Sequence, residues 1–389
     1  MIEMKELNLK NKTVLIRVDF NVPIHNNRIT SDARIRASIP TIELALKQNA
    51  KVIIMSHLGR PKEGQYQKIF SLLPIVEYLK KVFINTNIYF SEKLKKICMN
   101  PGDLLVLENV RFNAGEKNND IHLSKQYASL CDVFVMDAFG SAHRKESSTF
   151  GVGMFAKIAC AGPLFVSEIK ALRTALKNPN RPMIAIVGGS KISTKFQLLQ
   201  SLSKIADTVI VGGGIANTFL AIDYNIGKSL HEKEFINTAK KIRDKYNILI
   251  PVDSRVGTEF SKLSNAIVKK PFEIQEEEEI MDLGDKSMSN IENIIKKAKT
   301  ILWNGPLGVF EFPKFRIGTE RLAKSIAQSD AFSIAGGGET LSVIDMLNIQ
   351  DQISYISTGG AAFLQFVEGQ KLPTISMLEA VKKTIENLK

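Results

Sequence analysis

The sequence has little cysteine, and it lacks the features that would place a chain in a membrane or outside the cell. Cys98, Cys131 and Cys160 are its only cysteines, and their odd number and wide spacing fit neither a disulfide framework nor a metal-binding pair. No apolar run reaches the about 18 residues that a membrane-spanning helix needs, and the charged first residues do not resemble a secretory signal. We therefore expect a cytoplasmic protein with no membrane partner, in which Cys131 and Cys160 are buried, inert thiols.

Aromatic residues are also sparse, which bears on the net charge of +12. Many lysines fall in helical stretches with a solvated face, such as residues 93–96, 240–245 and 296–299, where no aromatic residues alternate with them. A nucleic-acid platform needs that alternation for base stacking. We therefore expect no nucleic-acid partner. A protein that bound nucleic acid through charge would instead retard the nucleic acid in a gel, and its affinity would fall steeply with salt concentration.

Two nucleotide-binding fingerprints are missing. No Gly-x-Gly-x-x-Gly opens a βαβ unit with an acidic residue after it, which argues against a nicotinamide-dependent dehydrogenase. Gly227, Lys228 and Ser229 resemble the end of a P-loop, but Ile222 stands where the first glycine is required.

Short β-branched runs alternate with longer amphipathic stretches, which is typical of βαβ units and parallel sheets. A length of 389 residues favours two or three domains. The expected strands are residues 13–18, 51–55, 86–90, 104–107, 133–136 and 157–160, then 183–187, 207–211, 247–252, 300–303, 332–335 and 353–356. The expected helices are residues 35–47, 71–81 (with Ser71 as N-cap), 164–177, 193–204, 214–222, 232–244, 289–298, 316–328, 339–347 and 377–389. We take the helix at 164–177 as the connector between two domains.

Arginine and histidine residues follow the strands of the first half, where the loops of a parallel sheet meet at one edge. This group contains Arg17, Arg34, Arg36, His57, Arg60, Arg111, His143 and Arg144. Guanidinium groups around one point repel each other unless an anion lies between them, and arginine pairs bidentately with carboxylate or phosphate. Asp19 and Asn21 can accept hydrogen bonds from a substrate hydroxyl. Arg17 is the weakest member, because an arginine before an acid in a strand can form an internal pair.

Glycines follow the strands of the second half, at 188–189, 212–214, 305, 308, 336–338 and 359–360. Such turns let backbone N–H groups approach phosphates at helix N-termini. Lys191 and Lys195 lie four residues apart, just inside one of these turns and on one helix face. Cations there oppose the helix dipole, so the pair calls for an anion; the alternative is a first turn that is simply solvated.

Two carboxylates accompany these turns. Glu339 follows the glycines at 336–338 and can hold Mg²⁺ on a nucleotide, although an acid at this position also favours a helix N-terminus. Glu311 is a candidate acceptor for a ribose hydroxyl. Trp303, the only tryptophan, precedes this loop and is expected in the core.

Several long motifs, in this order and spacing, resemble the phosphoglycerate kinase family over essentially the whole chain. The motifs cover residues 14–23, 57–61, 107–112, 137–144 and 303–311. The resemblance implies an α/β fold of two Rossmann-like domains, each a parallel sheet flanked by helices, joined by a connecting helix. The implied domains are residues 1–163 for 3-phosphoglycerate and 179–372 for the nucleotide, with 164–178 as connector and 373–389 packing back on the first domain.

The resemblance also implies roles for individual residues. The acid's pocket would contain Asp19, Phe20, Asn21, Arg34, His57, Leu58, Gly59, Arg60, Arg111 and Arg144. The nucleotide site would contain Lys195, Glu311, Gly337, Gly338, Glu339 and Thr340, with Glu339 as the metal ligand. The catalytic groups would be Arg34, Lys191, Lys195, Gly359 and Gly360, together with Mg²⁺.

The implied reaction is the reversible glycolytic transfer of a phosphoryl group between 1,3-bisphosphoglycerate and Mg-ADP, giving 3-phosphoglycerate and Mg-ATP. The phosphoryl acceptor is a carboxylate, already ionised at neutral pH, so no general base is needed. Catalysis then consists of in-line positioning, charge neutralisation and hinge closure that expels water. The resemblance favours a monomer.

Two departures from the family pattern keep open a kinase-like protein that only binds ligands. Glu339 stands where aspartate is usual, and its extra methylene changes the reach to Mg²⁺. Ala361 stands where a third glycine is frequent, and a methyl group there costs activity if the position needs an unusual backbone angle or a close approach.

Overall fold

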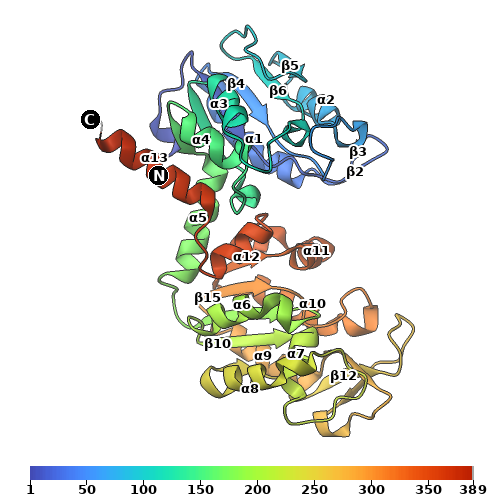
Figure 1. Cartoon of the computed structure of the whole chain (residues 1–389). Coiled ribbons are helices and arrows are strands. Elements are labelled where there is room, and N and C mark those ends of the chain that lie inside the picture. Colours follow the sequence, from blue (N-terminus) through green and yellow to red (C-terminus); the bar gives the residue numbers. More distant parts are fainter. Residues whose placement is uncertain (388–389) are drawn as a thin grey trace. The chain divides into compact units, whose positions relative to one another are not determined.

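The computed structural model describes residues 1–387, which divide into two compact units (Figure 1). Unit 1 consists of Met1–Ile169 and the segment from Lys371 onward, and unit 2 consists of Lys170–Gln370. The division falls inside helix α5 (Pro163–Leu176), the helix expected as the connector. Leu388 and Lys389, the end of the expected C-terminal helix, lie outside the described residues.

Unit 1 is built on a parallel sheet whose strand order is β5-β6-β4-β1-β7-β8. Its strands are β1 (Thr13–Arg17), β4 (Lys51–Met55), β5 (Ile88–Ser91), β6 (Leu104–Leu107), β7 (Val133–Met136) and β8 (Ala159–Ala161), beside a small hairpin of β2 (Ile24–His25) and β3 (Arg28–Ile29). Its helices are α1 (Ala33–Lys47), α2 (Leu73–Val82), α3 (Ile121–Ser129), α4 (Val152–Phe155) and α13 (Pro373–Asn387), with short turns η1 (Met4–Glu6), η2 (Lys68–Phe70), η3 (Val110–Phe112), η4 (Phe139–Ser141) and η5 (Ser147–Gly151).

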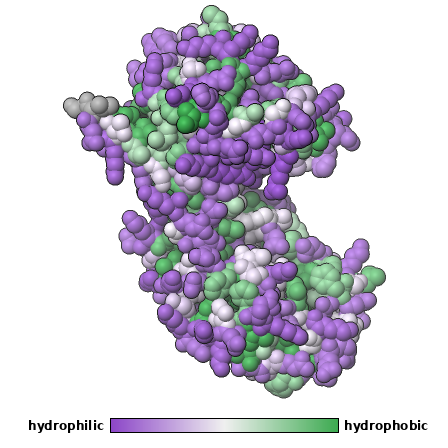
Figure 2. Space-filling model, in the orientation of Figure 1, coloured by the Kyte–Doolittle hydropathy of each residue, from purple (hydrophilic) through white to green (hydrophobic). Residues whose placement is uncertain are grey.

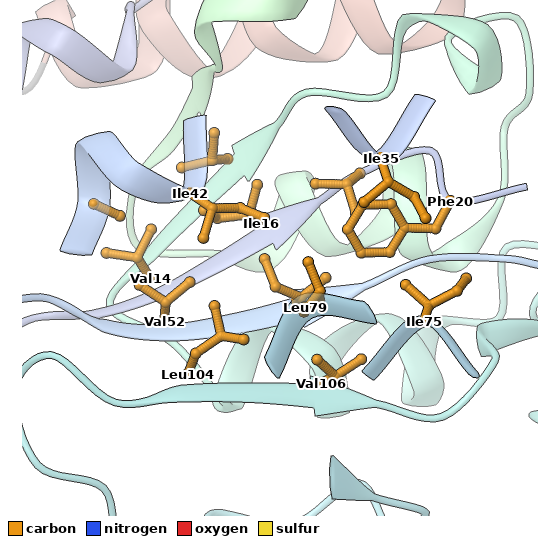
Figure 3. Packing of buried hydrophobic residues seen from close by; sticks show 14 of the residues in the cluster. Val14, Ile16, Phe20, Ile35, Ile42, Val52, Ile75, Leu79, Leu104 and Val106 are labelled. Carbon is orange, nitrogen blue, oxygen red and sulfur yellow. The ribbon is translucent and has the colours of Figure 1, made fainter. Parts of the chain in front are cut away.

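The core of unit 1 forms because its strands are apolar on both faces, as parallel strands under helices require. Figure 3 shows Ile35 and Ile42 of α1 and Leu79 of α2 lying over the strand residues Ile16 and Val106. Residues i, i+3 and i+4 of α1 and α2 supply the buried faces, as the helical period predicts.

Helix α13 belongs to unit 1 although it is the last element of the chain. Figure 1 shows α13 beside α4, and Thr374 Oγ1 donates a hydrogen bond to the carbonyl oxygen of Ala142 at 3.2 Å. Met377 packs so closely on Gly153 that a Cβ there would lie 2.3 Å from the Met377 sulfur. The end of the chain therefore completes the core of the first unit.

Unit 2 has a parallel sheet of strand order β11-β10-β9-β15-β16-β17 and a separate antiparallel sheet of order β13-β12-β14. The strands are β9 (Met183–Gly188), β10 (Thr208–Gly212), β11 (Ile248–Leu249), β12 (Ser254–Gly257), β13 (Ile267–Lys269), β14 (Glu279–Leu283), β15 (Thr300–Asn304), β16 (Phe332–Gly336) and β17 (Tyr355–Ser357). The helices are α6 (Ile192–Ser203), α7 (Gly213–Leu220), α8 (Ile236–Lys245), α9 (Asp285–Ile295), α10 (Ile317–Ala327), α11 (Gly338–Leu347) and α12 (Ala361–Val367), with η6 (Lys233–Phe235), η7 (Pro271–Glu273), η8 (Pro313–Phe315) and η9 (Gln350–Gln352).

In the large sheet of unit 2, β9 and β15 pair in parallel at the centre. The chain adds strands outward from β9 on one side and outward from β15 on the other, so the direction of strand order reverses between these two strands. In doubly wound sheets, ligands bind outside the carboxyl ends of the strands at such a switch point. The glycines after β9 and β15 lie at this point. Trp303 is buried beside it in the core, as expected, and its indole N–H donates to the carbonyl oxygen of Gly305 at 2.9 Å.

The structure changes some expected boundaries and adds elements. The expected strand 247–252 shrinks to the two residues of β11, and the helix expected to begin after Ser71 begins at Leu73. Ser71 still accepts a hydrogen bond from the Leu73 amide at 3.2 Å, but its hydroxyl is directed to Glu108. The antiparallel sheet β12–β14 and the β2–β3 hairpin were not predicted.

The surface of each unit is mainly hydrophilic on the face shown in Figure 2, with scattered apolar residues. No helix among residues 1–387 is both long and apolar enough to cross a bilayer. Cys131 and Cys160 are buried and unpaired, as expected, and Cys98 is exposed. Burial raises the pKa of the Cys131 thiol to about 12.

Candidate active site

The loops that follow β1, β4 and β6 are tied together at the carboxyl edge of the first sheet. The amide of Phe20 donates to Ser56 Oγ at 2.8 Å, and the amide of Val110 donates to the Ser56 carbonyl oxygen at 3.1 Å. The Val18 amide donates to the Met55 carbonyl oxygen at 3.1 Å, continuing the β1–β4 ladder. Ser56 therefore fixes the three loops that carry the predicted anion-binding residues.

A chain of short contacts connects the polar residues of these loops. Arg34 lies in the first turn of α1, and its NH1 donates to Asp19 at 3.3 Å and to the carbonyl oxygen of Asn21 at 3.0 Å. The Asn21 side-chain oxygen accepts from the Gly59 amide at 2.8 Å. Arg111 NH1 then donates to the Gly59 carbonyl oxygen at 2.6 Å. The structure thus brings together five of the predicted residues in one network.

Positive charge exceeds negative charge in this network. Arg111 and Arg144 each carry a buried N–H, Nε and NH1 respectively, for which no hydrogen-bond partner is found within residues 1–387. Glu146 is the acid facing Arg111, at 3.8 Å, and it is itself buried. Burial and the neighbouring Arg144 and Arg17 lower the pKa of Arg111. Unsatisfied donors on clustered guanidinium groups fit a carboxylate or phosphate.

The remaining predicted residues of unit 1 have different surroundings. Phe20 is buried in the core (Figure 3), and the Leu58 carbonyl oxygen is held by Asn109 at 2.8 Å, so both support the loops with their backbones. Arg60 is exposed. His143 lies at 3.3 Å from Arg144 Nε through its own Nε2.

Two arginines of the predicted cluster have structural partners instead. Arg36 is exposed and pairs with Asp32 at 2.8 Å along α1, so its place in the cluster was wrong. It lies two residues from Arg34 on a helix, and positions two apart do not share a face. Arg17 is fully buried and forms internal contacts, the alternative noted for it.

In unit 2 the backbones of two glycine turns pack at the switch point. A Cβ on Gly305, whose φ is 101°, would lie 2.2 Å from the Gly188 carbonyl oxygen. Glycine is required there because the two loops touch through their backbones. The Gly305 amide is held by Thr340 Oγ1 at 2.7 Å, which ties this turn to the first turn of α11.

The two lysines near the start of α6 differ in position. Lys195 lies in the first turn, and its Nζ donates to the Gly188 carbonyl oxygen. Burial lowers the pKa of Lys195, while Glu339 acts to raise it. Lys191 is exposed and is the N-cap residue, with extended backbone, and so does not lie inside the helix as expected.

An acid of this chain supplies part of the negative charge that the two lysines call for. Glu232 accepts from the Ser193 amide at 2.7 Å and from the Ser193 hydroxyl at 2.6 Å, at the N-terminus of α6. Burial, the largest single effect, acts to raise the pKa of Glu232, but the hydrogen bonds from Ser193 and the charge of Lys191 together lower it. This cap could not be predicted from local sequence, because Glu232 lies 39 residues away from Ser193.

A cavity of about 440 Å³ opens beside these glycine turns, within unit 2. Glu311 and Glu339 line it, as do the glycine residues 189, 213, 214 and 308. Its apolar walls come from Leu230, Phe260, Ile280, Met281, Val309 and Phe310, and sequence analysis had assigned none of them. Apolar walls with a few polar groups are typical of a small-molecule site.

The glycines at 336–338 lead from β16 into helix α11, and those at 359–360 precede helix α12. Gly337 has a φ of 100° and is the N-cap of α11, whose first turn contains Glu339 and Thr340. Gly360 has a φ of 53° and is the N-cap of α12. Ala361 is exposed at the first position of α12 and is absent from the positive-φ residues of the described chain, so its backbone angle is one that a methyl group allows.

Comparison with known proteins shows which family this chain resembles. A family model described as phosphoglycerate kinase matches residues 4–370. A phosphoglycerate kinase from Buchnera aphidicola subsp. Acyrthosiphon pisum (strain APS) is 67% identical over 378 residues, covering 97% of each chain. That from Buchnera aphidicola subsp. Schizaphis graminum is 65% identical over 379 residues, covering 97% of this chain and 98% of the relative.

Two solved structures agree with this. The structure of phosphoglycerate kinase from Coxiella burnetii superimposes with a TM-score of 0.94 at 48% identity, covering 97% of this chain and 99% of that one. The enzyme from Pyrococcus horikoshii OT3 gives a TM-score of 0.82 at 30% identity, covering 98% and 100%. The family transfers phosphate to a carboxyl group in glycolysis and uses a nucleotide substrate. The chain belongs to the phosphoglycerate kinase family.

Proposed function

We propose that the two sites divide the reaction between them, with 3-phosphoglycerate or 1,3-bisphosphoglycerate bound in unit 1 and ADP or ATP bound in unit 2. The observation that carries this proposal is the contrast between the two strand edges. One edge gathers guanidinium groups with unsatisfied N–H donors, which suits a small anion with several negative charges. The other combines glycine turns with an apolar cavity, which suits a base and its phosphates.

In unit 1 the residues offer both recognition and charge compensation. Arg34, Arg111 and Arg144 would pair with the carboxylate and phosphate, and Arg60 would close on the anion from solvent. Asp19 and Asn21 would accept from the substrate hydroxyl; their contacts with Arg34 and Gly59 already fix their orientation. Phe20, Leu58 and Gly59 would shape the loops that hold these groups.

In unit 2 the residues would hold the nucleotide and neutralise the transferring group. Phe260 and Phe310 would contact the base, Glu311 the ribose, and the turn at 337–340 the phosphates. Lys195 would bring positive charge to the switch point, although burial lowers its pKa, and Lys191 would approach the transferring phosphoryl group. The N-terminus of α12, at Gly359 and Gly360, would add backbone N–H groups for the transferring phosphoryl group.

Mg²⁺ is the usual companion of such a nucleotide, and the residues present fit it. Glu339 offers a carboxylate that is exposed, lines the cavity and stands in the first turn of a helix after a glycine turn. Mg²⁺ is commonly bound by one or two carboxylates together with substrate phosphates. When bound it would withdraw charge from the phosphate oxygens, and Glu339 would hold it directly or through water.

The chemistry needs no proton transfer by the protein, because the attacking or leaving group is a carboxylate. Its rate then depends on in-line placement and on charge neutralisation by Arg34, Lys191 and Lys195. Because the substrates belong to different units, the reaction requires closure, which excludes water from the acyl phosphate. We further propose a monomer that works in the cytoplasm.

A pair of matched variants on one helix tests the assignment of the acid site. Arg34→Gln removes the guanidinium that contacts Asp19, whereas Arg36→Gln removes the exposed one that pairs with Asp32. By titration calorimetry, Arg34→Gln should weaken 3-phosphoglycerate binding by about tenfold or more, the loss of a hydrogen bond to a charged group. It should leave Mg-ADP binding unchanged, and Arg36→Gln should change neither.

The complementary variant is Phe310→Ala, which should weaken Mg-ADP and leave 3-phosphoglycerate unchanged. A coupled assay with 3-phosphoglycerate and Mg-ATP measures turnover in the same proteins. If Arg34→Gln weakened the nucleotide instead, or if Phe310→Ala weakened the acid, the division of substrates between the units would be wrong.

A further inference from the structure

A buried chain of hydrogen bonds runs from an acid to the histidine of the anion site, within unit 1. Arg17 Nε donates to Ser148 Oγ at 3.0 Å, and Ser148 Oγ donates to Glu116 Oε1 at 2.5 Å. The Ser148 amide donates to the other oxygen of Glu116 at 3.1 Å. Arg17 NH2 lies 3.2 Å from His57 Nδ1. Arg17, Ser148 and Glu116 are each 0% exposed, so solvent does not compete for these contacts.

The direction of each hydrogen bond in this chain is determined by chemistry. A guanidinium group can only donate, so Ser148 Oγ accepts from Arg17 and has its own proton free for Glu116. By the same rule, His57 Nδ1 must accept from Arg17 NH2. A third Arg17 contact, from NH1 to the Val18 carbonyl oxygen at 2.5 Å, fixes the plane of the group.

This contact leaves His57 only one of its three states. The imidazolium ion and the Nδ1–H tautomer both place a hydrogen on Nδ1, where it would meet the N–H of Arg17. The remaining state carries its hydrogen on Nε2 and a lone pair on Nδ1. Nε2 has no hydrogen-bond partner within residues 1–387, so it is the nitrogen left to meet a ligand.

We propose that Arg17 is a positioning residue, held by Ser148 and Glu116, that fixes His57 as the neutral Nε2–H tautomer and so makes it a hydrogen-bond donor to the bound anion. Its role as a donor to the substrate rests on the function proposed above. Arg17 then has a task in the site without touching the substrate. His57 donates a hydrogen bond in this arrangement and transfers no proton in the reaction.

The electrostatics of the site support this assignment. Burial first, then Arg17, Arg111, Arg144 and Arg34, hold the pKa of His57 well below its ordinary value. These four arginines come from β1, η3, α1 and the loop after η4, and all of them disfavour the imidazolium ion.

The anchor at the far end of the chain compensates the charge of Arg17. Burial lowers the pKa of Arg17, and Glu116 is the largest of the opposing charges. Glu116 lies in the loop between η3 and α3, and it contacts Ser148, which is 32 residues later in the sequence. Without Glu116 the buried guanidinium would lack its main counter-charge.

The first test is direct observation of His57 in the ligand-free protein. Two-bond ¹H–¹⁵N correlation spectra of ¹⁵N-histidine-labelled protein distinguish the two tautomers and the imidazolium ion. His57→Gln identifies the His57 signals, and the exposed His25 and His122 give reference signals in the same spectra. We expect the Nε2–H tautomer alone across about pH 5 to 8, the range in which histidine ordinarily titrates. An Nδ1–H tautomer, or protonation of His57 within that range, would overturn the proposal.

The second test perturbs the anchor and leaves Arg17 and His57 in place. Ser148→Ala removes the acceptor of Arg17 Nε, and Ser148→Thr keeps the hydroxyl. We expect His57 in Ser148→Ala to show tautomer exchange and a pKa moved upward, and Ser148→Thr to restore the wild-type spectrum. Wild-type spectra in both variants would show that Ser148 does not hold Arg17, which refutes the chain. Arg17→Met should give the same change as Ser148→Ala or a larger one.

Kinetics separate this role from a general loss of structure. Ser148→Ala should raise KM for 3-phosphoglycerate by about tenfold, the effect of one misdirected hydrogen bond to a charged group, and leave KM for Mg-ATP unchanged. An equal rise in both constants would indicate general destabilisation and count against positioning. If wild-type protein showed the expected tautomer but no turnover, the proposed function would fail while the hydrogen-bond chain would stand.

Discussion

Replacing Thr340 by valine tests whether the bond between α11 and the turn at Gly305 stabilises unit 2. Thr340 Oγ1 accepts from the Gly305 amide at 2.7 Å, and both residues are buried. Valine has nearly the same shape, so the substitution creates no cavity but leaves the amide without a partner. That costs about 1–3 kcal/mol. For a unit of about 200 residues, such a loss lowers Tm by about 2–12 °C.

The only tryptophan of the chain makes this loss measurable in unit 2 by itself. Trp303 is buried there, and its indole N–H donates to the Gly305 carbonyl oxygen at 2.9 Å. Its fluorescence during urea titration therefore reports the free energy of unfolding of the same region. The nucleotide should also bind less tightly, because Thr340 and Gly305 shape the turns beside the cavity.

Two control variants isolate the hydrogen bond. Ser342→Ala removes an exposed hydroxyl from the same helix, where it contacts only the Gly338 carbonyl oxygen at 3.0 Å, and should change the free energy of unfolding little. Thr340→Ser keeps the hydroxyl and should lie between wild type and valine. A free energy of unfolding for Thr340→Val within about 0.5 kcal/mol of the wild-type value, the range of ordinary surface substitutions, would show that this hydrogen bond does not stabilise unit 2.

Three further predictions concern pH, the helix α12 and the metal. Burial raises the pKa of Asp137 and of Asp282 to about 7, above the value of an unfolded carboxyl group. Their contribution to stability is therefore full near about pH 4 and is lost as the pH rises through 7, so Tm should fall over that range. Asp137→Asn should make the fall of Tm with pH less steep in calorimetric scans, and an unchanged dependence of Tm on pH would contradict this. Ala361→Gly should leave turnover within about twofold and lower the free energy of unfolding by up to about 1 kcal/mol, since α12 gains nothing from a glycine at an ordinary helical position; a large gain in turnover would show that the methyl group obstructs the site. Glu339→Asp should keep turnover in the coupled assay while Glu339→Gln raises the Mg²⁺ concentration needed for half-maximal rate, and an unchanged Mg²⁺ dependence in Glu339→Gln would remove Glu339 from the metal.

The parallel sheets could be predicted from the sequence because their strands are buried on both faces. Runs such as residues 104–107 are wholly apolar, and the residues that follow them must meet at one edge. The arginine group and the glycine group could therefore be predicted from their positions after the strands, without knowledge of any long-range contact. The antiparallel sheet could not be found in this way, because β13 is exposed at Ile267 and Val268 and has only three residues.

Partners far apart in the sequence account for what the sequence did not show. Glu116 stands in a polar loop and looks like a solvated acid until Ser148 is brought against it. Glu232 is likewise an ordinary surface acid until it meets Ser193. Arg36 shows the reverse case, because its position beside Arg34 suggested the site, whereas helix geometry directs it to Asp32.

The position of α13 has a consequence for how the chain folds during synthesis. Unit 2 ends at Gln370, so its sequence is complete before the ribosome adds the last segment of unit 1. Unit 1 begins first but lacks Thr374 and Met377, which cover Ala142 and Gly153, until the chain is almost finished. The usual order, in which the N-terminal domain completes first, is therefore reversed here. A chain that ended at residue 370 would contain all of the second unit but a first unit with an uncovered core.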